Sequence, residues 1–134
     1  MSDTRKLDIS LLLLRLAFGG LMVINHGWGK LNKLLAGPPI KFADLFGLGS
    51  ELCLQLAVVG EVLCAILIVL GLFTRIAAVP ALITMLVAAF IVHGGDPLGD
   101  KEHALLFAVA YLVILILGPG RYSIDGWWKS RQLV

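Results

Sequence analysis

Four long apolar runs constrain this chain more than any other feature of its sequence. They cover residues 8–27, 51–72, 75–93 and 102–117. A helix that crosses a bilayer needs about 20 mostly apolar residues, and these runs are close to that length. They lack the alternation of apolar and polar residues that marks the strands of a membrane barrel. The sequence therefore predicts an all-α integral membrane protein, a four-helix bundle forming a single transmembrane domain over residues 1–134.

The composition supports a lipid environment. Hydrophobic residues make up 59% of the chain and charged residues 15%, whereas soluble domains have about 45–50% and about 25%. A soluble domain of this size would have no way to bury so much apolar surface. The net charge of +2 is small and scattered, and no basic patch interleaved with aromatic residues points to nucleic acid. We therefore expect the lipid bilayer as a partner and no nucleic acid.

The segments between the runs predict how the helices connect. Only a tight turn fits between residues 72 and 75, so the second and third helices must be antiparallel neighbours. The first connection is longer, and its Phe42, Leu45 and Phe46 fall on one face at helical spacing. This pattern predicts a short amphipathic helix at about 39–48 that lies at the membrane interface. A plain apolar loop is the alternative.

Lysine and arginine in the short connections predict the orientation of the helices. One side of the proposed bundle holds six basic residues: Arg5, Lys6, Arg75, Arg121, Lys129 and Arg131. The other side holds four: Lys30, Lys33, Lys41 and Lys101. Since basic residues favour the cytoplasmic side, we expect a multi-pass protein of the cell inner membrane with both termini in the cytoplasm.

Two ionisable residues fall at membrane depth, where they are costly and therefore informative. Arg15 lies about two turns into the first helix, and Glu61 lies near the middle of the second. Counted from the two membrane faces, their depths differ by about 5 Å, so the sequence predicts a buried ion pair between them. Such a pair either locks two helices in register or sets the electrostatics of the interior and relays a proton.

The first helix carries a polar and small-residue stripe that should face into the bundle. Its members recur at helical spacing: Asp8, Arg15, Gly19, Met22, His26 and Lys30. Within this stretch, Gly19 and Gly20 would let a neighbouring backbone come close.

A second group of polar residues gathers at the outer end of the predicted bundle. It contains His26, Lys30, His93, Glu102 and His103. These residues are candidates for a pocket in which His26 donates a hydrogen bond to the polar head of a lipophilic molecule and the apolar bundle holds its tail. Polar residues at headgroup level with no ligand are the alternative. No pair has a recognised metal-ligand spacing, so no metal site is predicted.

Four stretches of the sequence resemble the DoxX family of small four-helix membrane proteins. They are R-L-A-F-G-G at 15–20, H-G-W-G-K-L at 26–31, G-E-V-L-C-A-I-L-I-V-L-G-L-F-T-R at 60–75 and G-P-G-R-Y-S-I-D at 118–125. The family pattern points to a set of polar residues and one glycine: Arg15, His26, Gly27, Lys30, Glu61, Arg75, Arg121, Ser123 and Asp125. Of these, Arg121, Ser123 and Asp125 form a turn that we expect to tie the tail to the bundle, a structural role.

The resemblance implies a link to redox systems. Family members look like membrane subunits of such systems, some linked to quinone-coupled sulfur oxidation and others to oxidative-stress complexes. The leading hypothesis is therefore a redox-associated subunit that binds a quinone-like lipophilic molecule or supports a membrane oxidoreductase complex, with quinone as the candidate cofactor. A non-catalytic anchor or assembly partner and an oligomeric small-solute carrier are the alternatives, and the sequence leaves open whether the protein is an enzyme.

Overall fold

The computed structural model describes residues 1–133, and all regular elements among them are helices. The α-helices are α1 (Asp3–Leu14), α2 (Trp28–Ala36), α3 (Ser50–Val58), α4 (Cys64–Leu70), α5 (Thr74–Val87), α6 (Leu98–Leu117) and α7 (Ile124–Gln132). Wide π-helical turns continue several of them: η1 (Arg15–Gly19), η2 (Met22–Gly27), η3 (Val59–Leu63) and η4 (Ala88–Val92).

Three continuous helices are long and apolar enough to cross a membrane. They are Asp3–Ala36, Ser50–Leu70 and Thr74–Val92. The prediction of an all-helical membrane protein is confirmed to this extent. Helix α6 has 20 residues, but its first turns carry Asp100, Lys101 and Glu102, and it is not among the three. The predicted fourth span at 102–117 therefore stays a prediction.

The first helix is longer than predicted, and the predicted interfacial helix at 39–48 is wrong. The first helix continues from the predicted end at Gly27 to Ala36, because its glycines do not interrupt the helical backbone. Residues 37–49 contain no helix. Pro38 and Pro39 have no backbone N–H to donate, and Phe46 and Gly47 take positive φ angles of 59° and 70°, which ends any helical run there.

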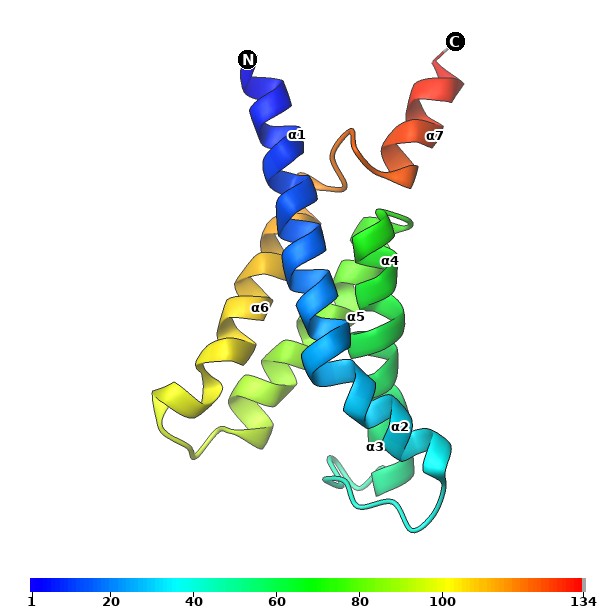
Figure 1. Cartoon of the computed structure of the whole chain (residues 1–134). Coiled ribbons are helices and arrows are strands. Elements are labelled where there is room, and N and C mark those ends of the chain that lie inside the picture. Colours follow the sequence, from blue (N-terminus) through cyan, green and yellow to red (C-terminus); the bar gives the residue numbers. More distant parts are fainter. Residues whose placement is uncertain (134) are drawn as a thin grey trace.

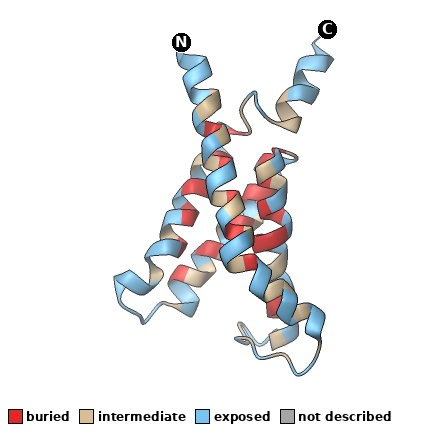
Figure 2. Ribbon diagram, in the orientation of Figure 1, coloured by how far each residue is buried: buried red, intermediate tan, exposed pale blue. Residues whose placement is uncertain are grey.

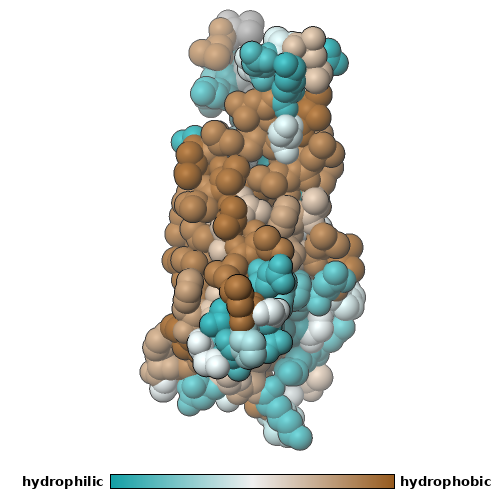
Figure 3. All heavy atoms as spheres, turned by 90° about the vertical axis from the view of Figure 1, so that its left-hand side faces the viewer, coloured by the Kyte–Doolittle hydropathy of each residue, from teal (hydrophilic) through white to brown (hydrophobic). Residues whose placement is uncertain are grey.

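The chain folds so that both termini lie at one end of the molecule (Figure 1). The tight turn between α4 and α5 and the turn between α6 and α7 lie at this end, and the 37–49 loop lies at the other (Figure 1). Buried positions concentrate where the long helices meet (Figure 2). They include Met22, Ile68, Ala78, Met85, Tyr111 and Ile114. On the face shown in Figure 3, apolar side chains cover most of the surface between more polar ends, as expected of a surface that faces lipid.

Small residues set how closely the first two long helices approach. A methyl group added at Gly27 would lie 2.8 Å from the carbonyl oxygen of Glu61, and one added at Gly19 would lie 3.1 Å from that of Ala65. The expected close approach at Gly19 therefore occurs, whereas Gly20 has no atom within 4 Å of such a methyl. Gly19 and Gly27 together fix the antiparallel register of the two helices.

Replacing Gly27 by alanine is expected to lower the free energy of unfolding by about 1–3 kcal/mol, because the new methyl pushes against backbone. Gly20→Ala is the matched control in the same helix. It has room and should be neutral or stabilising by up to about 1 kcal/mol. Thermal unfolding of both variants in detergent micelles measures the difference. Equal melting temperatures would contradict the packing described here.

Candidate functional site

A buried ion pair joins the first two long helices. The Nζ atom of Lys30 donates to both carboxylate oxygens of Glu61, at 2.7 and 2.5 Å. Glu61 lies in the wide turn η3 and is only 3% exposed, while the Lys30 side chain is 30% exposed. The close approach at Gly27, one turn before Lys30, brings the two side chains together. The pair therefore has a buried acid and an amine that reaches the surface.

The predicted ion pair between Arg15 and Glu61 is not formed. The Arg15 guanidinium instead donates to four backbone carbonyl oxygens, those of Ile68 (2.9 Å), Val69 (3.2 Å), Pro119 (2.6 Å) and Tyr122 (3.0 Å). Ile68 lies seven residues beyond Glu61, or about 10 Å along the helix. The depth estimate failed because the first helix continues past the outer face assumed for it, to Ala36. The close approach at Gly27 sets a register that places Lys30, not Arg15, beside Glu61.

Two histidines lie next to the ion pair. The rings of His26 and His103 stack with centroids 5.1 Å apart and planes 9° from parallel. Phe107 meets the His26 ring edge-on at 5.5 Å. Glu61 and Lys30 lie close to His26. We call His26, Lys30, Glu61 and His103 the inner cluster.

The other two predicted ligand-binding residues lie outside the inner cluster. The Nδ1 atom of His93 is 2.8 Å from the carboxylate of Asp96. Glu102 lines a groove of about 320 Å³ on the surface of α6, among apolar side chains. Within residues 1–133, no three histidine, cysteine, aspartate or glutamate side chains are grouped so as to hold a metal ion.

Sequence reasoning missed Tyr111 and Phe107 as members of this region. Tyr111 is fully buried, and its hydroxyl has no hydrogen-bond partner within the described chain. It lies near Glu61 and Cys64. A signal was present, because His103, Phe107 and Tyr111 follow one another at intervals of four residues and so share one face of a helix. That face of α6 turns toward the inner cluster.

The predicted turn residues lie at the opposite end of the molecule, the end that holds both termini (Figure 1). The Asp125 carboxylate accepts from the backbone N–H groups of Phe73 and Thr74, each at 2.9 Å, and from the Thr74 hydroxyl at 2.8 Å. Ser123 caps the start of α7 by accepting from Gly126 N–H at 2.9 Å. The Asp125 contacts link α7 to the beginning of α5, whose first N–H groups would otherwise have no partner.

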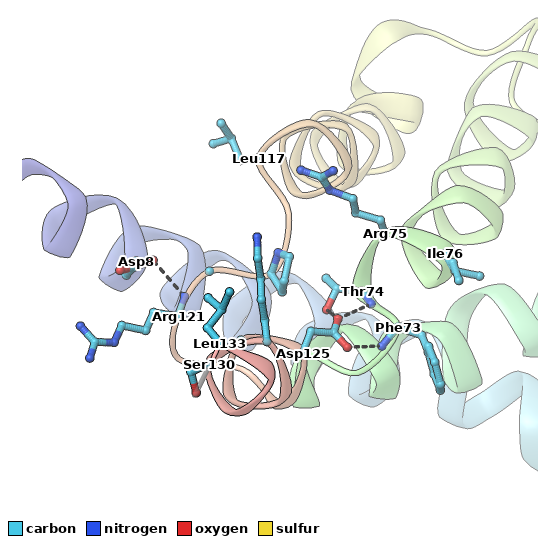
Figure 4. Close-up of a pocket in the computed structure, with 14 residues that line it drawn as sticks. Asp8, Phe73, Thr74, Arg75, Ile76, Leu117, Arg121, Asp125, Ser130 and Leu133 are labelled. Carbon is cyan, nitrogen blue, oxygen red and sulfur yellow. Dashed lines mark hydrogen bonds between the residues drawn. The ribbon is translucent and has the colours of Figure 1, made fainter.

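The Arg121 backbone closes the same turn against the first helix. Its N–H donates to Asp8 Oδ1 at 2.9 Å, while its side chain extends away from the turn (Figure 4).

Comparison with known proteins agrees with the helical membrane architecture. The model of the DoxX family matches residues 10–94. An uncharacterized membrane protein of Mycobacterium tuberculosis is 32% identical over 113 residues, which cover 74% of this chain and 63% of that protein. The chain thus spans less than two thirds of the length of this curated relative. No solved structure matches the chain. The family match includes three members of the inner cluster, His26, Lys30 and Glu61, and ends before His103.

Proposed function

The chain belongs to the DoxX family of membrane proteins, and on that premise we propose that it is a redox-associated subunit that binds the head of a quinone-like lipophilic molecule. The observation that carries the proposal is the inner cluster. It combines ring N–H donors, a buried carboxylate and a partly exposed ammonium in one place between apolar helices. Ionisable groups kept at such a depth usually mark a ligand or proton path.

The proposed setting is a bundle of four membrane-spanning helices with both termini in the cytoplasm. Helix α6 packs along α5 and exposes an apolar stripe that suits lipid, consisting of Leu106, Val109, Leu112 and Ile116. The end that holds both termini also holds most of the basic residues at the helix ends, and such residues favour the cytoplasm. In this setting the inner cluster lies toward the outer leaflet.

The residues of the inner cluster fit a quinone head. Neutral imidazole carries one N–H donor, so His26 can donate to an oxygen of the quinone head. Phe107 packs against the His26 imidazole ring. The orphaned Tyr111 hydroxyl is a further donor on the same face of α6. A bound quinone would supply the redox chemistry, in which electrons and protons are taken up together.

Lys30 and Glu61 can move a proton. Through their direct hydrogen bond the Lys30 ammonium can pass a proton to the Glu61 carboxylate, and the exposed side of Lys30 can take up a replacement proton from water at the surface. In this proposal the electrons come from a partner oxidoreductase, because Cys53 and Cys64 lie in one continuous helix, about 16 Å apart along its axis, and a disulfide needs Cα atoms within about 7 Å. The proposal therefore implies a protein partner in a membrane redox complex.

Calorimetric titration of the purified protein with a short-chain benzoquinone tests this function. His26→Ala is expected to weaken binding about tenfold, the effect of removing one hydrogen bond of about 1.4 kcal/mol to a buried ligand. His93→Ala is the matched control, since this histidine pairs with Asp96 outside the cluster. Absence of binding to the unmodified protein, or an equal effect of both substitutions, would rule out the proposed site.

A second candidate function, a non-catalytic anchor for another protein, is favoured by α7. This helix projects beyond the ends of the long helices (Figure 1), with only its first turn hydrogen-bonded to the start of α5. It exposes Trp127 and Trp128 by 50% and 45%. Two results together would favour the anchor over the quinone site. The protein would bind no benzoquinone, and a stoichiometric protein partner would bind equally well to the variant in which both His26 and Glu61 are replaced.

A further inference from the structure

A pocket lies at the end of the molecule opposite the inner cluster, and neither the family match nor the proposed function assigns it a role. It measures about 670 Å³ and lies between the start of α5, the end of α6 and α7 (Figure 4). Three basic residues line it: Arg75, Arg121 and Lys129. Apolar side chains share the same wall: Phe73, Ile76, Leu117 and Leu133.

The two carboxylates that line this pocket, Asp8 and Asp125, already accept hydrogen bonds from the protein itself. Asp125 accepts three hydrogen bonds from Phe73 and Thr74, and Asp8 accepts one from the backbone of Arg121. Their oxygens are therefore engaged by N–H and hydroxyl donors. Their negative charges remain, but the three basic residues outnumber the two carboxylates in the lining. The basic side chains are exposed, and the Arg75 guanidinium makes one hydrogen bond, to the Ile116 carbonyl oxygen at 3.2 Å. Arg75 thus keeps donors available for an anion.

The basic side chains do not all point the same way. Arg75 reaches from α5 toward Leu117 at the end of α6, while Arg121 extends to the far side, beyond Asp8 (Figure 4). Arg75, together with Lys129 from α7, is therefore the better placed to hold an anion over the apolar wall.

An apolar track leads from the pocket along the lipid-facing side of α5. Ile76 lines the pocket and is 72% exposed, and Val79 and Ile83 follow it at 43% and 54%. Their spacing of three and four residues places all three on one face of the helix. A cationic head region above an apolar track is complementary to an amphiphile with an anionic head.

We propose that this pocket binds the phosphate headgroup of an anionic membrane phospholipid, with Arg75 and Lys129 on the phosphate and the α5 track against an acyl chain. Arginine suits this role because its planar guanidinium matches phosphate oxygens in pairs. The end of the chain rich in basic residues is also the end at which anionic headgroups of the cytoplasmic leaflet would be met. The site is independent of quinone binding.

Native mass spectrometry of the delipidated full chain in detergent tests the proposal with three probes: phosphatidylglycerol, phosphatidylcholine and inorganic phosphate. We expect phosphatidylglycerol to bind about tenfold more tightly than phosphatidylcholine, and either Arg75→Gln or Lys129→Gln to weaken it by about tenfold through loss of one charge-assisted contact. Arg131→Gln is the matched control, because this guanidinium lies 4.1 Å over the Trp127 ring and does not line the pocket.

Lys129→Gln keeps the test valid if Arg75→Gln alters folding, since Lys129 lies on the exposed surface of α7. Equal binding of phosphatidylglycerol by the unmodified protein and both variants would overturn the proposal. So would inorganic phosphate that displaces the lipid at comparable concentration, because the site would then recognise a free anion. His26→Ala should leave lipid binding unchanged, which separates this site from the inner cluster.

Discussion

Replacing Lys30 by methionine is expected to lower the free energy of unfolding by about 3–5 kcal/mol, the usual effect of removing one partner from a buried ion pair. The Glu61 carboxylate is 3% exposed and receives its hydrogen bonds from Lys30. Without the ammonium it must stay charged and unpaired or take up a proton. Thermal or denaturant unfolding of the purified protein in micelles measures the loss.

Removing one partner of the Lys30–Glu61 pair is expected to cost different amounts of stability, depending on which partner is removed. Glu61→Gln should destabilise less than Lys30→Met, because the 30% exposed Lys30 side chain can turn its ammonium toward water. The double variant should recover most of the loss, since no buried charge is left uncompensated. Additive losses in the double variant would contradict the pairing of these two residues.

Replacing Arg15 by methionine should lower the free energy of unfolding by about 3–5 kcal/mol, because several buried carbonyl oxygens lose a charged donor at once. Arg15 is 1% exposed and ties the end of α4 to the turn before α7. Arg15→Lys should recover only part of this stability, since a single ammonium group cannot reach the carbonyl oxygens of both segments as the planar guanidinium does.

Arg5→Met is the control for Arg15, because Arg5 is exposed near the chain start and should change stability by less than about 0.5 kcal/mol. Unfolding in micelles compares the three variants. A loss for Arg15→Met no larger than that for Arg5→Met would contradict the bridging role.

Hydrophobicity predicts where the second and third membrane-length helices lie, because lipid-facing segments must be apolar over a full span. It gives no sign of α7, which contains no long apolar run. The second helix was expected at 51–72 and runs over Ser50–Leu70, and the third was expected at 75–93 and runs over Thr74–Val92. The end of the first helix was misjudged because Gly27 looks like a break in the sequence. In the structure it is a contact point with Glu61, which only the neighbouring helix reveals.

The burial of Arg15 and Glu61 could be predicted, but their partners could not. Both residues interrupt apolar runs, and both are buried in the structure. Which side chains meet depends on the register of two antiparallel helices, and this register is fixed by the close approaches at Gly19 and Gly27. The wide turns η2 and η3 also change which side each helix presents, and no pattern in the sequence indicated them.

The most direct test of the proposed function is mass spectrometry of small molecules extracted from the full protein after gentle purification from native membranes. The proposed function predicts a near-stoichiometric quinone or similar polar-headed lipophilic molecule in the extract, and a clearly smaller amount when His26 is replaced by alanine but not when His93 is. A folded protein that yields no such molecule, or that retains the same amount of it in the His26→Ala variant, would contradict a head-binding role for the inner cluster.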